Sequence, residues 1–196
     1  MERIPILGCE DECWFDENFL ELKEASTFFD KLSIETDWIQ PQIRMFGKWV
    51  DQPRLIAWQS SEGLSYSYSG ITLTASPYSE LVEAIARKIE IKTGLTFNSV
   101  LINYYRDGKD SMGWHADNEP ELGENPMIAS LSLGSARDFV LKHNQRSDLK
   151  KVFSLNSGSL LLMGKGIQKN WKHALPKRAH AGPRINLTFR RILVEE

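Results

Sequence analysis

The sequence is poor in cysteine. Its two cysteines, Cys9 and Cys13, lie close together, and no cluster of histidines or further cysteines accompanies them. Structural zinc sites use four such ligands in closely spaced pairs, so this class of site is excluded. The chain also lacks a run of about 18 apolar residues, which a membrane-spanning helix would need. Residues 1–12 contain acids and a proline where a secretion signal would have a basic flank and an apolar stretch. We therefore expect a soluble intracellular protein with no membrane partner, whose thiols are reduced and structurally unimportant.

Repeats, low-complexity tracts and linkers are absent as well. With 196 residues, of which 41% are hydrophobic, the chain is long enough for one well-buried core and short for two. We therefore predict a single domain over residues 1–196, and we expect a monomer.

The hydrophobic pattern predicts two helices followed by many strands. From a candidate cap at Asp16, apolar residues recur at helical spacing as far as Leu32. A second helix is predicted from Ser79 to Thr93, and Gly94 is placed to end it. Short strands are then expected at residues 97–105, 128–133, 138–143, 151–155, 159–163, 171–175 and 184–192. This order favours a mostly β fold, an antiparallel jelly-roll core buttressed by two helices of the N-terminal half.

The formal net charge of −2 conceals an uneven distribution. Residues 137–191 contain 13 of the 24 Lys and Arg but two acids, whereas residues 1–40 contain 11 acids and three bases. Segregated charge on this scale is typical of a surface that faces a polyanion, although solvated faces also vary in sign. A nucleic-acid partner is one interpretation of the basic part.

A candidate metal site begins with His115 and Asp117. They are two residues apart, so on an extended segment both side chains leave from the same face and can approach one ion. His173, from a later predicted strand, would complete two histidines and one carboxylate, a set that leaves open positions on Fe(II). Taken alone, such a pair is more often an ordinary polar turn. His143, in a basic stretch, and His180, in a predicted loop, are left out of the ligand set.

The last predicted strand alternates between polar and apolar side chains. The polar face carries Arg184, Asn186, Thr188 and Arg190. Two arginines on the inward face of a strand are costly to bury unless they meet anions, and a small dicarboxylate would satisfy both. A solvent-facing stripe on an edge strand is the alternative. A second polar pair, which could hydrogen-bond the same diacid, shares one face of its own strand: Asn103 and Tyr105.

Several short motifs occur in order between residues 42 and 193. They are Phe46-Gly-Lys, Pro53-Arg54, Tyr66-Ser-Tyr-Ser-Gly70, Asn103-Tyr-Tyr105, His115-Ala-Asp117, Arg137-Asp-Phe139, Gly158-Ser-Leu, Trp171-Lys-His173-Ala-Leu-Pro176 and the strand from Arg184 to Arg190. With these motifs the chain resembles the AlkB family of nucleic-acid dealkylating dioxygenases, particularly the branch that acts on duplex and single-stranded DNA. The resemblance implies a double-stranded β-helix core (residues 97–193), preceded by an acidic helical extension (1–40) and a nucleotide-recognition region (41–78).

The resemblance also implies a metal, a co-substrate and a reaction. Fe(II) would be held by His115, Asp117 and His173, which with Arg190 form the expected catalytic set. The co-substrate 2-oxoglutarate would contact Asn103, Tyr105, Arg184, Asn186, Thr188 and Arg190, with Arg184 on its distal carboxylate. The implied activity is direct repair of N-alkylated DNA bases such as 1-methyladenine and 3-methylcytosine. Decarboxylation of 2-oxoglutarate to succinate would be coupled through O2 to hydroxylation of the alkyl group and release of formaldehyde, with ascorbate as a reductant in vitro.

Further residues resemble substrate contacts of the family. Because a base inside a duplex is unreachable, it has to be flipped out before it reacts. Tyr66 and Tyr68 resemble stacking aromatics, and Phe46 resembles a wedge that fills the gap in the base stack; packing within the fold is the alternative for each. The other candidate contacts are Gly47, Lys48, Arg54, Asn118 and Glu119. Asn118 is an amide where the family often has an acid, so the preferred lesion stays open.

The expected partner is alkylated DNA, duplex or single-stranded, with RNA as a further candidate. The compartment would be the cytoplasm in a bacterium or the nucleus in a eukaryote. Two alternatives remain open. One is the same oxygenase chemistry on RNA, protein or a small molecule, since a fold does not determine its substrate. The other is a nucleic-acid-binding module without catalysis.

Overall fold

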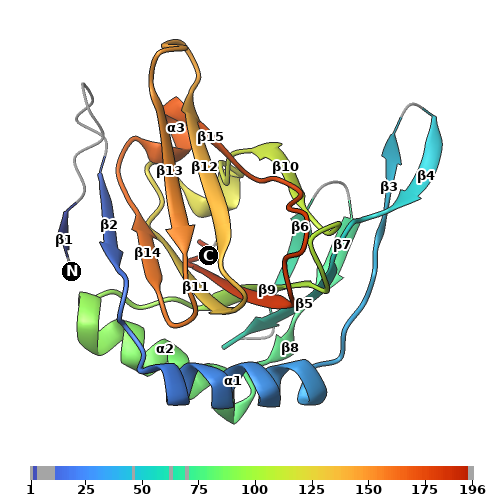
Figure 1. Cartoon of the computed structure of the whole chain (residues 1–196), viewed down its shortest axis with the longest axis vertical. Coiled ribbons are helices and arrows are strands. Elements are labelled where there is room, and N and C mark those ends of the chain that lie inside the picture. The colour runs from blue at the N-terminus through green and yellow to red at the C-terminus, as the bar shows by residue number, and fades with distance from the viewer. Residues whose placement is uncertain (1, 4–11, 46, 62–63, 69–70, 194–196) are drawn as a thin grey trace.

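The computed structural model describes residues 2–3, 12–45, 47–61, 64–68 and 71–193 (Figure 1). Its larger sheet has eight strands in the order β1-β2-β14-β11-β16-β9-β5-β8. Their bounds are β1 (Glu2–Arg3), β2 (Cys13–Asp16), β5 (Leu55–Ser60), β8 (Ser76–Pro77), β9 (Ser99–Tyr105), β11 (Ile128–Gly134), β14 (Leu160–Met163) and β16 (Arg184–Arg190). Neighbouring strands are antiparallel except for the short parallel pair of β5 and β8.

A second sheet of four antiparallel strands lies opposite the larger one (Figure 1). Its order is β10 (Met112–His115), β15 (Trp171–Leu175), β12 (Arg137–His143) and β13 (Lys150–Leu155). Apolar side chains of both sheets pack into one buried cluster between them, with Leu161 from the larger sheet and Leu141 and Trp171 from the smaller one. The two facing sheets confirm the predicted jelly-roll.

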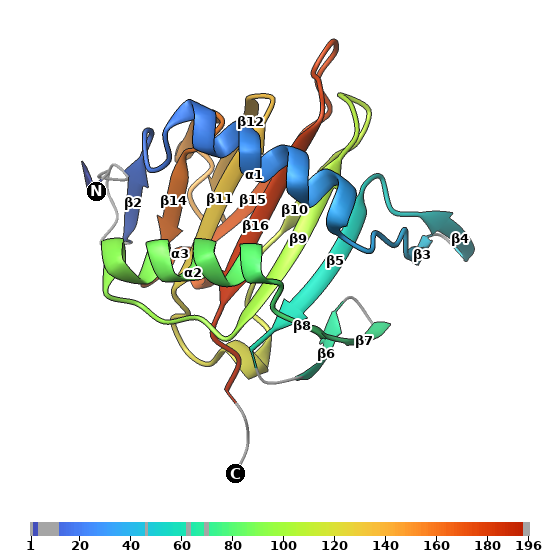
Figure 2. The ribbon, with the colours of Figure 1, turned by 90° about the horizontal axis from the view of Figure 1, so that it is seen from below.

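Two helices cover the outer face of the larger sheet, as Figure 2 shows. They are α1 (Leu22–Glu35) and α2 (Glu80–Thr93). Helical spacing turns Leu32 of α1 and Ile85 and Ile89 of α2 toward the sheet, where they meet Leu187 and other apolar residues in the main core. The helices therefore seal the outer face of the larger sheet, and the polar side chains of β16 lie on its inner face.

The second helix has the predicted ends, but the first begins later than expected. Ser79 caps α2 by accepting a hydrogen bond from the Val82 amide at 3.3 Å, and Gly94 closes it with a φ of 73°. Asp16, predicted to cap the first helix, is instead the last residue of β2, and α1 starts at Leu22. The reason is long-range: β2 pairs with β14, which extends this segment before the helix can begin.

The expectation that the thiols have no structural importance is wrong for Cys13. Its side chain is fully buried and packs between the sheets against the cluster that contains Ile128 and Met163. Burial raises the pKa of this thiol to about 12, so it stays protonated and behaves as a small apolar side chain. Cys9 lies outside the described residues.

Two hairpins and two short helices complete the described chain. The hairpins pair β3 (Gln42–Met45) with β4 (Lys48–Asp51) and β6 (Ser65–Tyr68) with β7 (Ile71–Thr74). The short helices are η1 (Pro120–Leu122) and α3 (Ile167–Asn170). Within the described residues, no helix has the length and apolar character needed to cross a membrane.

Candidate active site

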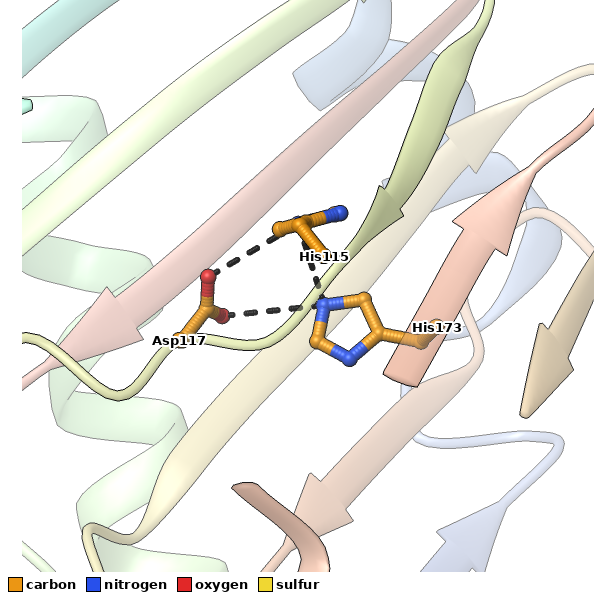
Figure 3. Close-up of side chains that lie close together, drawn as sticks. All are labelled: His115, Asp117 and His173. Atoms are coloured by element: carbon orange, nitrogen blue, oxygen red, sulfur yellow. Dashed lines mark hydrogen bonds and ion pairs between the residues drawn. The ribbon is translucent and has the colours of Figure 1, made fainter. Parts of the chain in front are cut away.

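Three side chains that are distant in sequence meet between the two sheets (Figure 3). His115 ends β10 and lies directly opposite His173 of the neighbouring strand β15, and the coil after β10 brings Asp117 beside them. The Nε2 atoms of the two histidines are 3.1 Å apart. Asp117 places Oδ1 3.7 Å from His115 Nε2 and Oδ2 3.9 Å from His173 Nε2. The arrangement is compact enough for one ion to contact all three.

The protonation states of this cluster suit a cation. Burial alone would raise the pKa of Asp117, but the positive charge of Arg190, whose Nη2 lies 3.0 Å from Oδ1, and the two histidines lower it to about 2. Burial lowers the pKa of His173 to about 3. At neutral pH the carboxylate is therefore charged and His173 is neutral, which are the forms that coordinate metals.

A backbone carbonyl selects the tautomer of His115. Its Nδ1 lies 2.9 Å from the carbonyl oxygen of Gly113. A carbonyl can only accept, so Nδ1 carries the proton and Nε2 presents its lone pair toward His173 and Asp117. Such a hydrogen bond to the outer nitrogen is the usual partner of a metal-ligating histidine. The donor set therefore fits a divalent ion of the imidazole and carboxylate class.

A buried cation lies in the same pocket as the three ligands. Arg184 is 1% exposed; its Nη2 donates to Ser132 Oγ at 2.9 Å, and its guanidinium carbon is 5.4 Å from the centroid of the Tyr105 ring. Its Nε has no hydrogen-bond partner, and no described carboxylate forms an ion pair with it. Burial lowers the pKa of Arg184 to about 10, so the group is still charged at neutral pH. An uncompensated buried charge is costly, and an anionic ligand would supply the missing partner.

The neighbouring polar residues of β16 form a closed hydrogen-bond network. Asn186 Nδ2 donates to Ser130 Oγ and to the carbonyl of Leu131, both at 2.9 Å. Thr188 Oγ1 donates to Asn186 Oδ1 at 3.2 Å. These contacts hold the polar face of β16 rigid against β11.

The structure brings together every residue predicted for the metal and the co-substrate. One pocket is lined by His115, Asp117, His173, Asn103, Tyr105, Arg184, Asn186, Thr188 and Arg190. The expectation that alternation would put the four polar residues of β16 on one face is confirmed. Their individual roles stay predictions.

The predicted substrate contacts are dispersed. Gly47 and Lys48 are exposed in the β3–β4 hairpin, Asn118 is exposed beside the metal ligands, and Glu119 is half-buried before η1. Arg54 is buried, and it hydrogen-bonds Asn103. Two of the three aromatics have described backbone but no described side chain, namely Tyr66 and Tyr68 on β6, and Phe46 lies outside the described residues.

Sequence reasoning missed three polar residues that hold the site in place. Ser130 and Ser132 of β11 support Asn186 and Arg184. Gln168 of α3 accepts a hydrogen bond from the backbone amide of Asp117 at 3.0 Å. The serines alternate with leucines in β11, so strand periodicity could have indicated them. Gln168 carries no such signal.

The fold and the site together define the class of non-haem metal enzymes with a facial triad of ligands, and a buried arginine lies in the same pocket. A family model described as the 2OG-Fe(II) oxygenase superfamily matches residues 13–190. Among curated relatives, human DNA oxidative demethylase ALKBH2 is 40% identical over 182 residues, which cover 87% of this chain and 70% of that protein. Mouse alpha-ketoglutarate-dependent dioxygenase alkB homolog 3 is 39% identical over 184 residues, or 89% of this chain and 64% of that protein.

The chain belongs to the 2OG-Fe(II) oxygenase superfamily and, within it, to the AlkB family. It spans less than two thirds of the bovine DNA oxidative demethylase ALKBH2 (65%), to which it is 39% identical. A solved structure, that of OsALKBH1, superposes with a TM-score of 0.68 over 91% of this chain and 97% of that chain; at 17% identity it supports the fold alone. The family specifies Fe(II), O2 and 2-oxoglutarate. The donor set and the uncompensated arginine fit both the metal and the diacid.

Proposed function

We propose that the protein is an oxidative demethylase that repairs N-alkylated DNA bases such as 1-methyladenine and 3-methylcytosine. The observation that carries the proposal is the convergence of the ligand set and buried Arg184 in one pocket. Relatives from human and mouse that are 40% and 39% identical over 87% of this chain bear the name DNA oxidative demethylase. Bound iron would supply oxygen activation, coupled to decarboxylation of 2-oxoglutarate, hydroxylation of the alkyl group and loss of formaldehyde.

The residues of the pocket divide into two proposed roles. His115, Asp117 and His173 hold Fe(II), and Arg190 keeps Asp117 charged and oriented by its contact at 3.0 Å. Arg184 takes the distal carboxylate of 2-oxoglutarate by charge-assisted hydrogen bonds. The remaining contacts to the co-substrate come from Asn103, Tyr105, Asn186, Thr188 and Arg190.

A row of lysines supports a nucleic-acid substrate. Lys142 of β12 lies directly opposite Lys150 of β13 on one side and Lys172 of β15 on the other. All three are exposed, and none forms an ion pair with a described carboxylate. Like charges opposite one another destabilise a sheet, so the row favours a polyanion that neutralises it. We propose that the lysine row contacts phosphates of the DNA backbone.

Two hairpins extend the surface that carries the lysine row. The β12–β13 hairpin and the β3–β4 hairpin, which carries Gly47 and Lys48, both extend toward the top of Figure 1. We propose that DNA lies along this end, in duplex or single-stranded form, with Phe46, Tyr66, Tyr68, Asn118 and Glu119 as further candidate contacts. We also propose that the substrate is DNA rather than RNA and that the protein is a monomer. It would act in the cytoplasm of a bacterium or in the nucleus of a eukaryote.

The experiment is mass spectrometry of oligonucleotides that contain 1-methyladenine or 3-methylcytosine, after incubation with the protein, Fe(II), 2-oxoglutarate and ascorbate. We expect loss of the methyl group and formation of succinate, both abolished in His115→Ala. Matched DNA and RNA oligonucleotides, single-stranded and duplex, test the preferred substrate. Succinate without demethylation would move the substrate to another class. If the metal-loaded protein bound DNA but formed neither succinate nor demethylated oligonucleotide, that result would favour the non-catalytic module.

A further inference from the structure

Arg54 is buried, although its charge has no acidic partner in the described chain. The residue precedes β5 and is 4% exposed. Its Nε donates a hydrogen bond to Oδ1 of Asn103 on β9 at 2.9 Å, and it forms no ion pair with a described carboxylate. Burying a guanidinium that hydrogen-bonds a neutral amide, without a carboxylate to balance its charge, is costly, so the contact calls for a functional explanation.

The contact determines which way the amide of Asn103 points. A guanidinium has only donors, so the atom that faces Arg54 must be the amide oxygen. The amide nitrogen Nδ2 then points away from Arg54, and no described residue accepts a hydrogen bond from it. Asn103 lines the pocket that contains Arg184 and the metal ligands, whereas Arg54 does not. The nitrogen is thus the polar atom that Asn103 offers to the pocket.

Backbone contacts hold Arg54 in place on both sides. The Arg54 amide donates to the carbonyl of Gln52 at 2.8 Å, and the carbonyl of Pro53 accepts from the Ser111 amide at 2.9 Å. Ile56, two residues further along β5, pairs directly with Asn103 of β9. These backbone contacts hold the segment before β5 against β9 and against the segment that leads into β10. If the Asn103 amide flipped, the Arg54 guanidinium could therefore not easily move with it and keep the hydrogen bond.

We propose that Arg54 is a positioning residue that fixes the amide of Asn103, so that Nδ2 donates a hydrogen bond to an oxygen of 2-oxoglutarate. This inference rests on the proposed co-substrate site. Without Arg54, the amide can turn its oxygen toward the pocket, where it would face the anion as a second acceptor. The loss would fall on co-substrate binding and leave the metal ligands intact.

The proposal differs in its consequences from the predicted contact between Arg54 and the nucleotide. A nucleotide contact would change affinity for the oligonucleotide. A positioning role changes affinity for 2-oxoglutarate, in the absence of any DNA. The two roles can therefore be separated in one series of variants.

The test measures the dissociation constant of 2-oxoglutarate by calorimetry on the full chain loaded with Mn(II), which avoids turnover. We expect Arg54→Met to weaken binding roughly tenfold, as loss of one hydrogen bond to a charged ligand would. In demethylation assays the KM for 2-oxoglutarate should rise by a similar factor, with kcat changed less than about twofold. Arg54→Lys keeps a donor and should recover most of the affinity. It also serves if the methionine variant does not fold.

A double-mutant cycle and a control make the test specific. In an Asn103→Ala background, Arg54→Met should cause no further loss of 2-oxoglutarate affinity, because the amide it positions is gone. Lys31→Met removes an exposed cation of α1, outside every proposed site, and should leave that affinity unchanged. A general structural role would instead lower Mn(II) affinity as well and give additive losses.

Three outcomes would overturn the inference. Unchanged 2-oxoglutarate affinity in Arg54→Met, with weaker oligonucleotide binding, would make Arg54 a nucleotide contact. Additive losses in the cycle would make it part of the scaffold. Failure of the wild-type protein to bind 2-oxoglutarate would overturn the proposed function and this inference together, whereas the first two outcomes leave the proposed function standing.

Discussion

The backbone amide of Asp117 donates a hydrogen bond to Oε1 of Gln168 at 3.0 Å. Gln168 is buried on α3, five residues before His173, and its Nε2 contacts the sulfur of Met163 at 3.7 Å. One short segment therefore carries one metal ligand and restrains another. Because the positions of the ligand atoms, as well as their identities, determine how well an ion is bound, this contact should contribute to metal affinity.

We expect Gln168→Ala to weaken Mn(II) or Fe(II) binding about tenfold, since outer contacts of metal ligands commonly have effects of this size. Metal titration of the protein without co-substrate measures it. Lys169→Ala, the next residue on the same helix and exposed, is the matched control and should leave metal affinity unchanged. A Gln168→Ala protein with a lower unfolding temperature but wild-type metal affinity would show that the contact serves stability alone.

Arg184→Met should separate co-substrate binding from stability. The substitution removes the partner of the distal carboxylate, so we expect 2-oxoglutarate affinity to fall at least about 100-fold. It also removes a buried charge that lacks an acidic partner in the described chain. The free energy of unfolding without ligand should therefore rise, by about 1 kcal/mol.

Denaturant unfolding with and without 2-oxoglutarate tests both parts of this prediction. The co-substrate should stabilise the wild-type protein and not the Arg184→Met variant. Arg184→Lys retains the charge without the planar fork and should bind with intermediate affinity. Strong destabilisation of Arg184→Met in the absence of ligand would mean that the hydrogen bond to Ser132 and the Tyr105 contact outweigh the cost of the buried charge.

The residues that line the candidate site could be predicted from the sequence more readily than the residues that hold them in place. Strand alternation has a period of two residues, so the local sequence alone put Arg184 and Arg190 on one face of β16. The orientation of Arg54 depends on Asn103, 49 residues away, and no local pattern encodes it. The predicted start of the first helix was wrong for the same reason. Asp16 suits a helix cap locally, but its pairing with Leu160 of β14 makes it the end of a strand. Long-range contacts decided each of these positions.

The pH dependence of stability should report on Asp110. Burial alone would raise its pKa, but hydrogen bonds from the side chain and backbone of Arg106, at 2.8 to 2.9 Å, outweigh burial and lower it. A carboxyl group whose folded-state pKa is depressed stabilises the fold above its unfolded pKa, near 3.9, and the contribution disappears as pH falls through the folded value. Asp110→Asn should therefore cost about 1 kcal/mol at pH 7, a modest value because Arg106 is half-exposed.

Denaturant unfolding of the wild type and Asp110→Asn from neutral pH to acid checks this expectation. The difference in free energy of unfolding should be constant above about pH 5 and shrink below pH 4. A difference that persists undiminished at the lowest accessible pH would assign the effect to lost geometry rather than lost charge.

The lysine row should determine the salt dependence of DNA binding. Lys142, Lys150 and Lys172 lie abreast on three neighbouring strands, and each phosphate contact releases condensed counterions when DNA binds. Replacing all three with alanine should reduce the slope of log affinity against log salt by about 2 to 3 for a duplex, and weaken methylated and unmethylated DNA alike. Fluorescence anisotropy over a series of KCl concentrations measures the slope.

Changing Lys23 and Lys31 of α1 to alanine provides the control. These residues lie on the far side of the larger sheet, so the variant should keep the wild-type slope. Because the row places like charges opposite one another, the triple variant should also unfold at a temperature no lower than the wild type. An unchanged slope would place the DNA backbone elsewhere on the molecule.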